Sequence, residues 1–369
     1  MKITKTDIWT VVVPTIPGTV HSPEYGEAGW DKVPKHIIRI NTDEGFCGIG
    51  ETGRGVPKES VEALAKDLEG KDPRALLLQQ FPSTCPVDGS NDPEWWKGQS
   101  AGPTMAGYEA IEMAIFDLVG KIFARPAHWF LGGAIRDRVA ADFWIGHQTP
   151  EHAARSTKIA VERGFKGLKM KCKIGEPMVE RCEAIWDVAG RDFRLTIDPN
   201  TRFYHLPETI ALARELAPRG HVEVFEDPML KEHLDWYREF KAEGIVPVAL
   251  HLGSPAAILD AIKADACDYL NLGGSMIQFV RNAAIAHAAS IPVWHGSGND
   301  LGIMEFSYLH AAAAARNCVL ASDFVGSWTR EDDLVVDGLQ FDKATVIVPQ
   351  TPGLGCELDM DAVEKYRVE

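Results

Sequence analysis

The second half of the chain repeats one pattern: a short apolar strand that ends in a polar residue, followed by an amphipathic segment of helical spacing. The polar strand ends recur at an even pitch, with intervals of 27, 28 and 25 residues between Lys171, Asp198, Glu226 and His251. Strand–helix units of this length, repeated in a row, predict a closed parallel barrel. An open, doubly wound sheet is the alternative. No Gly-x-Gly-x-x-Gly follows an early strand, which disfavours the dinucleotide-binding form of that sheet.

We expect eight barrel strands between residues 138 and 325, with the sequences VAADFWI, GLKMKCK, RLTIDPN, VEVFEDP, VPVALHL, DYLNLGG, IPVWHGS and CVLASDF. Residues 1–122 instead predict an α+β domain, with a hairpin turn at Asp43–Gly45 and helices over 59–80 and 104–124. The barrel then occupies residues 123–340. The extended, Pro- and Gly-rich segment 341–369 is expected to fold back onto the first domain.

Composition excludes several classes of partner. Of 369 residues, 38 are Lys or Arg and 53 are Asp or Glu, so the net charge of −15 disfavours nucleic acids and anionic membranes. The seven cysteines include no Cys-x-x-Cys pair, which argues against a disulfide framework or structural zinc and favours a cytoplasmic protein. We also expect neither a signal peptide nor a membrane span.

The polar strand ends are the candidate chemical groups, because the active site of such a barrel lies at the carboxyl ends of its strands. In chain order they are Lys169 and Lys171, Asp198 with Asn200, Glu226 with Asp227, His251, Asn271, His295 and Asp323. Any one of these acids alone is more often a turn or helix-cap residue. Together, buried acids next to lysines predict a cation site flanked by proton-transfer groups, since a buried charge must be paired.

Three stretches carry a resemblance to a known family: FDLVGKIFARPAHWFLGG, GFKGLKMKCKIG with its Lys-x-Lys, and LTIDPN followed by FEDP at the next strand end. The chain resembles the enolase superfamily, in the branch of mandelate racemase and the muconate-lactonizing enzymes. The resemblance implies a modified (β/α)7β barrel, an N-terminal α+β capping domain, and a C-terminal segment that returns to the cap. It also implies a homo-oligomer.

The chemistry that the resemblance implies is removal of the proton α to a carboxylate, giving an enediolate held on Mg²⁺. A lysine that acts as base must be neutral, and a second ammonium nearby favours the neutral form. Lys171 resembles the base and Lys169 its partner beside the substrate carboxylate. Lys171 with Lys173 is a second possible pair, since these lysines share one face of the strand. Asp198 and Glu226 resemble two metal ligands, with Asn200 beside them.

Three strand ends depart from the family pattern. His251 stands where a third carboxylate ligand is usual in the family. It is either a ligand to Mg²⁺ or to a softer ion such as Mn²⁺, or a water molecule fills the ligand position, or the metal site is weakened. The remaining alternative is an imidazole that is only hydrogen-bonded in the barrel mouth. On the sixth strand, Gly273 replaces a lysine and Asn271 precedes it. On the seventh, His295 is close to the position of the family's catalytic histidine, and Asp300 is a candidate to orient it.

Asp323 resembles the group that hydrogen-bonds the substrate. By the same resemblance, loops of the capping domain set specificity, and His21, Tyr25, Trp30 and Arg54 are candidates to contact the far end of the substrate. Arg54 in this polar set suggests a polyhydroxylated or anionic end.

The leading hypothesis is dehydration of a sugar acid or a related hydroxy-carboxylate. Lys171 would remove the α-proton, and His295 would protonate the departing hydroxyl. Racemisation, epimerisation or cycloisomerisation of a related acid is an alternative, and so is a metal-poor, non-catalytic relative that binds a carboxylate. A Schiff-base aldolase barrel is a weaker option that the Asp198–Glu226 pair argues against.

Overall fold

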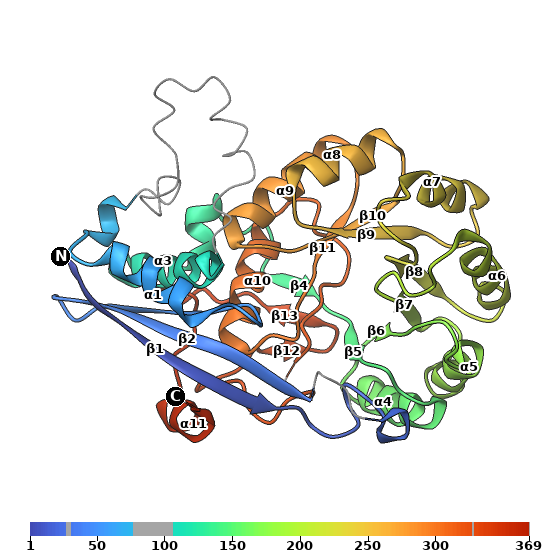
Figure 1. Cartoon of the computed structure of the whole chain (residues 1–369), viewed down its shortest axis with the longest axis horizontal. Helices are drawn as coiled ribbons and strands as arrows, with labels where there is room; N and C mark the ends of the chain where they lie inside the picture. The colour runs from blue at the N-terminus through green and yellow to red at the C-terminus, as the bar shows by residue number, and fades with distance from the viewer. Residues whose placement is uncertain (27–30, 77–105, 327, 369) are drawn as a thin grey trace.

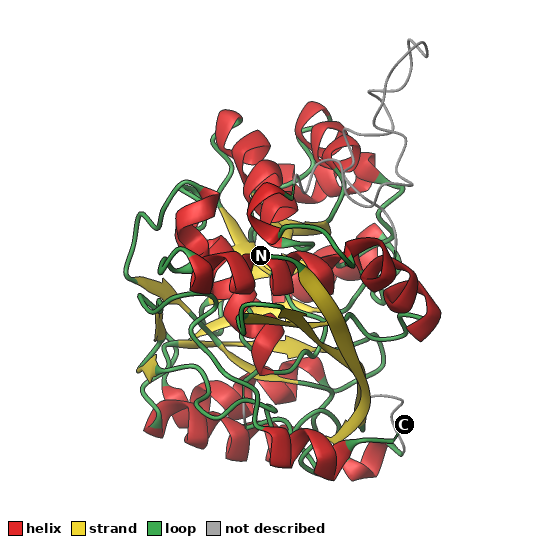
Figure 2. Cartoon of the chain, turned by 90° about the vertical axis from the view of Figure 1, so that its left-hand side faces the viewer, coloured by secondary structure: helices red, strands yellow, loops and turns green. Residues whose placement is uncertain are grey.

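The computed structural model describes residues 1–26, 31–76, 106–326 and 328–368. Its N-terminal part is a three-stranded antiparallel sheet of order β1-β2-β3, formed by Ile3–Pro14, Lys32–Thr42 and Cys47–Glu51. The predicted hairpin turn connects β2 to β3, and Gly45 adopts a positive φ of 82° there. The long strands β1 and β2 run across the left of Figure 1, and Figure 2 views the molecule from that side.

Two helices cover one face of this sheet, α1 (Lys58–Leu68) and α3 (Tyr108–Ile122). Helix α3 lies so close to β3 that a Cβ at Gly48 or Gly50 would meet a backbone oxygen of α3 at 2.0 or 2.1 Å. The helix expected over 59–80 is shorter than predicted. It ends at Leu68, before Gly70 with a positive φ of 78° and before Pro73, which starts the 3-10 helix η2 (Pro73–Ala75).

The second part is a curled sheet of seven parallel strands, in the order β11-β10-β9-β8-β7-β6-β5. The strands are β5 (Phe143–Ile145), β6 (Gly167–Lys171), β7 (Arg194–Asp198), β8 (Val222–Glu226), β9 (Val248–Leu252), β10 (Tyr269–Leu272) and β11 (Val293–His295). The helices between and after them are α4 (Pro150–Glu162), α5 (Met178–Ala189), α6 (Leu206–Leu216), α7 (Leu234–Glu243), α8 (Pro255–Lys263), α9 (Met276–Ala288) and α10 (Gly302–Ala314). Helices α4 to α9 form an arc around the strands in Figure 1, so the predicted alternation is confirmed.

The closure of the barrel differs from the prediction at both ends. Residues 138–145 were expected as one strand, but β4 (Arg138–Ala140) joins another sheet, and the buried Asp142, which accepts from Arg194 Nη2 at 2.9 Å, separates it from β5. The expected eighth strand forms only isolated bridges, from Cys318 to Val293 and from Ser322 to Ala141. This irregular segment still closes the gap between β11 and β5.

The C-terminal residues contact both parts of the molecule. The short strands β12 (Phe341–Asp342) and β13 (Thr345–Ile347) form a sheet with β4 beside the barrel. Helix α11 (Met360–Tyr366) lies under β1 in Figure 1, and Val368 N–H donates to Thr10 O at 2.9 Å. The short 3-10 helices η1 (Pro23–Tyr25) and η4 (Ala127–Leu131) complete the elements. In the described part of the chain, no helix meets the length and apolarity that a bilayer span requires.

Two buried carboxylates of the capping sheet and α3 bind the barrel at helix N-termini. Glu51 on β3 accepts from the N–H groups of Leu301 and Met304 at 2.7 and 2.9 Å, at the start of α10. Glu112 on α3 accepts from Ser275 Oγ at 2.8 Å and from Ile277 N–H at 3.1 Å, at the start of α9. Exposed backbone N–H groups at a helix start favour a carboxylate. Since both helices start after barrel strands end, the cap lies over the carboxyl-end rim of the barrel.

Candidate active site

The alternation of side chains along β6 and β7 brings charged groups inside the barrel. Leu168, Met170 and Ile197 point outward and are fully buried under the helices. The residues between them point inward, and Lys171 pairs in register with Asp198 on the next strand. Parallel strands end at one rim, so the polar strand ends of neighbouring strands meet there.

Lys169 is the centre of this cluster. Its Nζ lies 2.5 Å from Asp323 Oδ2, 2.7 Å from Glu226 Oε2 and 3.1 Å from Asp198 Oδ2, and its side chain is 4% exposed. One buried ammonium therefore holds three carboxylates that are far apart in the sequence.

Lys171 contacts both this cluster and the solvent-accessible side of the rim. Its Nζ forms an ion pair with Asp198 Oδ2. The same side chain lines a cavity of about 470 Å³ at the carboxyl end of β5 to β7. Lys173 lies beyond the end of β6 and lines the same cavity, whereas Lys169 and Lys171 lie within the strand and both pair with Asp198.

The two predicted asparagines lie on either side of the acids. Asn200 N–H donates to Asp198 Oδ1 at 2.9 Å, and Asn200 lines the cavity with a positive φ of 47°. Asn271 Nδ2 donates to Glu226 Oε1 at 2.7 Å. The backbone N–H of Asn200 and the side-chain amide of Asn271 therefore each fix the orientation of an acid, and Asn200 also lines the cavity.

The charges in the cluster set its protonation. Burial opposes the charge on Lys169, but Asp323 and Glu226 outweigh it and raise the pKa of Lys169 well above its ordinary value. Burial also acts to raise the pKa of Asp198, yet Lys171 and Lys169 hold it well below its ordinary range. Burial and the neighbouring Asp198 raise the pKa of Glu226 to about 8. Glu226 is therefore mostly protonated at neutral pH, because the positive charge nearby does not offset its burial and the charge of Asp198.

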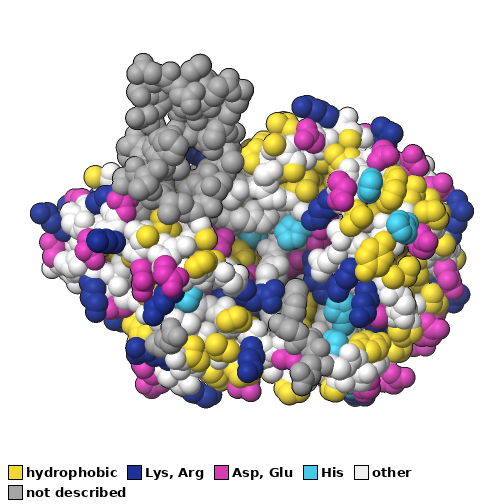
Figure 3. All heavy atoms as spheres, in the orientation of Figure 1, with side chains coloured by type: hydrophobic (Ala, Val, Ile, Leu, Met, Phe, Trp, Pro, Cys, Tyr) yellow, Lys and Arg dark blue, Asp and Glu magenta, His cyan; other side chains and the backbone are white. Residues whose placement is uncertain are grey.

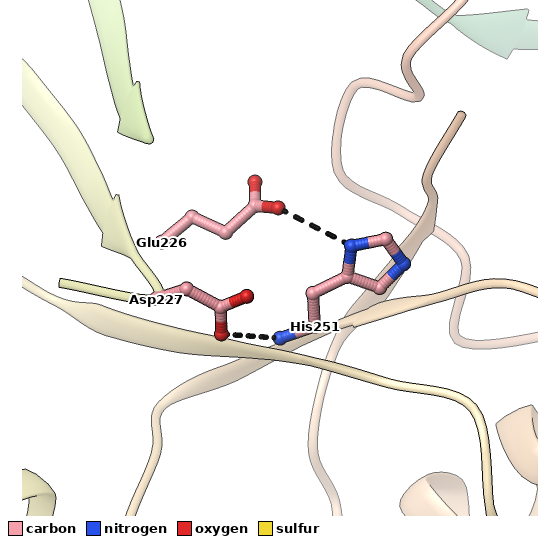
Figure 4. Close-up of side chains that lie close together, drawn as sticks. All are labelled: Glu226, Asp227 and His251. Carbon is pink, nitrogen blue, oxygen red and sulfur yellow. Dashed lines mark hydrogen bonds and ion pairs between the residues drawn. The ribbon is translucent and has the colours of Figure 1, made fainter. Parts of the chain in front are cut away.

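His251 lies beside Glu226, as Figure 4 shows, with Nδ1 at 3.8 Å from Glu226 Oε1. Burial and Lys169 lower the pKa of His251, so its imidazole is neutral at pH 7. Its backbone is held from both sides: its N–H donates to Asp227 Oδ1 at 2.9 Å, and its carbonyl accepts from Lys231 Nζ at 2.6 Å. Lys231 also pairs with Asp227 Oδ2 at 2.7 Å.

These contacts add Lys231 to the residues that the sequence analysis identified, and they give Asp227 a role. No local pattern marked this pair in the sequence, because Asp227 and Lys231 lie in the irregular segment between β8 and α7 and not on a helix. The structure also supports a cation site here. Glu226, Asp227 and His251 each offer a ligand atom, and these atoms lie within 4.8 Å of one another.

The charge balance of the cluster fits a divalent cation. Within the described residues, four carboxylates form ion pairs with only three ammonium groups. The carboxylates are those of Asp198, Glu226, Asp227 and Asp323, and the ammonium groups are those of Lys169, Lys171 and Lys231. At neutral pH the fourth acid, Glu226, holds a proton that a divalent cation would displace. A neutral imidazole beside these acids completes a donor set of oxygen and nitrogen that divalent ions accept.

His295 does not lie where the sequence analysis expected it. Its neighbour Trp294 packs inside the barrel against Val224 and Ala249, so His295 points outward. Its ring is stacked between Phe279 of α9 and Tyr308 of α10, at centroid distances of 4.3 and 4.0 Å.

The surroundings of His295 are those of a core histidine. Its Nδ1 is 2.7 Å from Gly296 O, and burial lowers its pKa to about 4. Asp300 does not bond to it; Asp300 accepts from Tyr308 Oη at 2.7 Å and pairs with Lys35 at 2.5 Å. The expectation that His295 is a catalytic acid on the rim was therefore wrong, because the side-chain alternation of β11 is shifted by one residue from that expectation.

The four residues of the capping domain that are candidates for substrate contact differ in where they lie. His21 lines the cavity, and its ring lies 5.9 Å from that of Tyr25 in an edge-to-face contact. Arg54 does not line the cavity, and it interacts electrostatically with Asp300 at the cap–barrel contact. Trp30 lies outside the described residues.

Further cavity residues went unnoticed in the sequence: His147, which follows β5, and Arg202, which follows β7. The cap loop is bound to the barrel there, since Ser22 N–H donates to His147 O at 2.8 Å and His147 N–H donates to Val20 O at 3.0 Å. Gly146 permits this approach, because a Cβ there would meet Val20 O at 1.7 Å. Only the three-dimensional structure brings these residues together.

The chain is similar in sequence and fold to known enzymes. The family model described as "Enolase C-terminal domain-like" matches residues 151–362. N-succinyl-L-Arg/Lys racemase of Bacillus cereus is 24% identical, over 100% of this chain and 98% of the relative. D-gluconate dehydratase of Thermoproteus tenax is 26% identical, over 90% of this chain and 70% of the relative. The crystal structure of the Bacillus cereus racemase superposes with a TM-score of 0.82 at 22% identity, covering 100% of this chain and 99% of that one.

Proposed function

Since the chain belongs to the enolase superfamily, in the branch of mandelate racemase and the muconate-lactonizing enzymes, we propose that it removes the proton α to the carboxylate of a small hydroxy acid. One observation carries this proposal: the amine of Lys171 faces the cavity and also contacts the buried acid cluster through Asp198. In its neutral form, an amine in that position can accept a proton from a bound substrate, and a cation bound at the acids would favour that form. General base catalysis of this kind contributes about 10² to 10⁴ in rate.

The other groups of the cluster stabilise charge. Lys169 keeps its proton, because three carboxylates surround it, and supplies a fixed positive charge in a buried site where such a charge acts strongly. Asp198, Glu226 and His251 would hold Mg²⁺ or Mn²⁺, as the family resemblance implies. Of these, Glu226 and His251 belong to the close group of ligand atoms, and its third member, Asp227, fixes the position of His251 together with Lys231. When bound, the divalent cation would neutralise negative charge that develops on the substrate carboxylate.

Dehydration of a sugar acid is the reaction we favour. The α C–H bond breaks, its electron pair forms a C=C bond to the β-carbon, and the β-hydroxyl leaves as water. Racemisation needs a second base opposite Lys171, but β10 and the two residues after it read YLNLGG, with Asn271 bonded to Glu226. A relative named D-gluconate dehydratase supports a sugar acid as substrate.

We assign protonation of the departing hydroxyl to His21 instead of His295. His21 lines the cavity, and its buried Nε2 has no hydrogen-bond partner among the described residues. An imidazole that faces the cavity can donate to a hydroxyl there, whereas His295 is stacked between two helices.

The experiment is a panel of aldonic and aldaric acids incubated in D₂O with Mg²⁺ or Mn²⁺, with wild type, Lys171→Met and the exposed-lysine control Lys166→Met. We expect a 2-keto-3-deoxy acid, detected as its semicarbazone, from wild type and Lys166→Met and not from Lys171→Met. Inversion or isomerisation of an acid without formation of a keto acid would show that the reaction is racemisation or cycloisomerisation and not dehydration. Binding without exchange of the α-hydrogen would identify a non-catalytic carboxylate-binding relative.

The wider expectations from the sequence belong to the same proposal. We propose that residues 1–122, 123–340 and 341–369 are the cap, the catalytic barrel and a returning C-terminal segment. A cytoplasmic location, a homo-oligomeric state and the absence of nucleic-acid partners are further parts of it. Light scattering of the purified protein tests the oligomeric state.

A further inference from the structure

The wall of the cavity beyond Lys171 carries positive charge that no carboxylate offsets. Lys173 and Arg202 both line it, and neither forms an ion pair within the described part of the chain. Arg202 is fixed in place, because its Nε donates to Pro199 O at 2.8 Å and its Nη2 lies 3.1 Å from His147 Nε2. Figure 3 shows Lys, Arg and His side chains gathered near the middle of this face.

Glu176, whose Oε2 accepts from the backbone N–H of Lys173 at 3.3 Å, has its charge offset by other side chains. Its Oε2 lies 2.8 Å from Nη2 of the buried Arg181, and its Oε1 lies 2.7 Å from His147 Nδ1. Because Arg202 donates to Nε2 of His147, the imidazole carries its proton on Nδ1 and donates it to Glu176. Burial lowers the pKa of His147, which agrees with a neutral ring. Glu176 therefore leaves the charges of Lys173 and Arg202 uncompensated.

The cavity consequently has two different ends. At the reactive end, the charge of Lys171 is matched by Asp198. At the far end, two cations face the cavity in a protein whose net charge is −15. A local excess of positive charge against an acidic background attracts a small anion. The volume of about 470 Å³ is that of a small-molecule site.

We propose that Arg202 and Lys173 bind a second anionic group, a carboxylate or a phosphate, at the end of the substrate distant from the reacting carbon. The substrate is then a diacid or a phosphorylated acid and not a simple aldonic acid. This inference rests on the proposed function in one respect only, that Lys171 marks the reactive end. A guanidinium suits both groups, since its N–H donors match paired oxygens.

Equilibrium binding to Lys171→Met tests this without turnover. The probes are galactarate as the diacid, galactonate as the matched monoacid, and 6-phosphogluconate as the phosphorylated acid, each titrated calorimetrically with Mg²⁺ present. We expect a dianion to bind at least about tenfold more tightly than galactonate, as a charge-assisted hydrogen bond in a cavity allows. The dianion that shows the advantage identifies carboxylate or phosphate as the second group.

Variants added to Lys171→Met locate the effect. Arg202→Met should remove the advantage, Arg202→Lys should restore part of it, and Lys173→Met should reduce it. Lys166→Met, which removes an exposed lysine before β6, should leave it unchanged. Galactonate affinity should stay within about twofold in Lys166→Met. A circular dichroism spectrum that matches the parent in every variant separates loss of the anion site from damage to the fold.

The proposal is overturned if neither dianion binds more tightly than galactonate, or if the advantage survives Arg202→Met. These results are independent of the proposed function. Absence of keto acid and of α-hydrogen exchange in wild type would refute the chemistry while leaving a dianion preference in place. Turnover of galactonate with the same kcat/KM as both galactarate and 6-phosphogluconate would refute the anion site while leaving the chemistry in place.

Discussion

Replacement of Lys169 by methionine should destabilise the protein to an extent that depends on pH. The side chain is buried, and its Nζ contacts three carboxylates at 2.5, 2.7 and 3.1 Å. Removing one partner of a buried ion pair costs about 3–5 kcal/mol, because the remaining charge is left unpaired. Since three acids share this ammonium, we expect a loss of about 4–5 kcal/mol at pH 8, at the upper end of that range.

The pH dependence follows from the acids that remain. Burial raises the pKa of Glu226 and of Asp323 even in the presence of Lys169. An acid whose pKa is higher in the folded state contributes stability below its unfolded pKa and loses that contribution as the pH rises through the folded value. In Lys169→Met these acids have no ammonium partner, so the deficit relative to wild type should widen from about pH 4 to about pH 8.

The assay is urea unfolding followed by far-UV circular dichroism at pH 5 and pH 8, in EDTA so that no metal contributes. Lys166→Met serves as the control, because an exposed lysine should change the free energy of unfolding by no more than about 0.5 kcal/mol. A deficit below about 1 kcal/mol at pH 8, or one of equal size at both pH values, would show that Lys169 does not neutralise the three acids.

Three further predictions concern side chains at the rim, outside the barrel and at the cap. His21→Asn should slow the release of water from the substrate by about 10² or more, while exchange of the α-hydrogen continues. Both rates are measured by NMR in D₂O, and an equal loss of the two rates would exclude His21 as the acid. His295→Phe should keep kcat/KM within about threefold of wild type, since the new ring can occupy the stack between Phe279 and Tyr308. A loss of kcat/KM of about 10² or more, as expected for removal of a general acid, would show that His295 takes part in catalysis. Burial raises the pKa of Glu112 to about 7, so its neutral form contributes stability below its ordinary value of 4.5 that is lost as the pH rises through 7. Glu112→Gln should flatten this part of the pH profile of urea unfolding, and an unchanged slope between pH 5 and pH 8 would contradict the shift.

The periodic part of the fold was predictable from the sequence. The strands that end at Lys171, Asp198 and Glu226 are confirmed, because apolar residues alternate with polar ones along them and each ends beside a turn. The resemblance to the enolase superfamily is confirmed as well. Both ends of the barrel were harder to predict. There β4 leaves the barrel for the C-terminal strand β13, and the segment around Ser322 closes the gap with isolated bridges. These pairings depend on distant segments, which local patterns do not reveal.

The candidate active site was also predictable only in part. The convergence of Lys169 with Asp198 and Glu226 follows from strand register, which the sequence pattern contains. The direction of His295 depends on which residue of a three-residue strand starts the alternation, and VWH is too short to fix this. Arg202 and His147 follow different strands, and their contact arises only from the packing of two loops.

The most direct test of the central claim is the rate at which the α-hydrogen of a bound substrate exchanges with deuterium from solvent. It compares wild type with Lys171→Met, each with saturating Mg²⁺ and with EDTA. The account predicts exchange in wild type with Mg²⁺, and a fall by at least about 10³ both in EDTA and in the variant, whose circular dichroism should match wild type. Exchange that continues unchanged in Lys171→Met would contradict the assignment of this amine as the base.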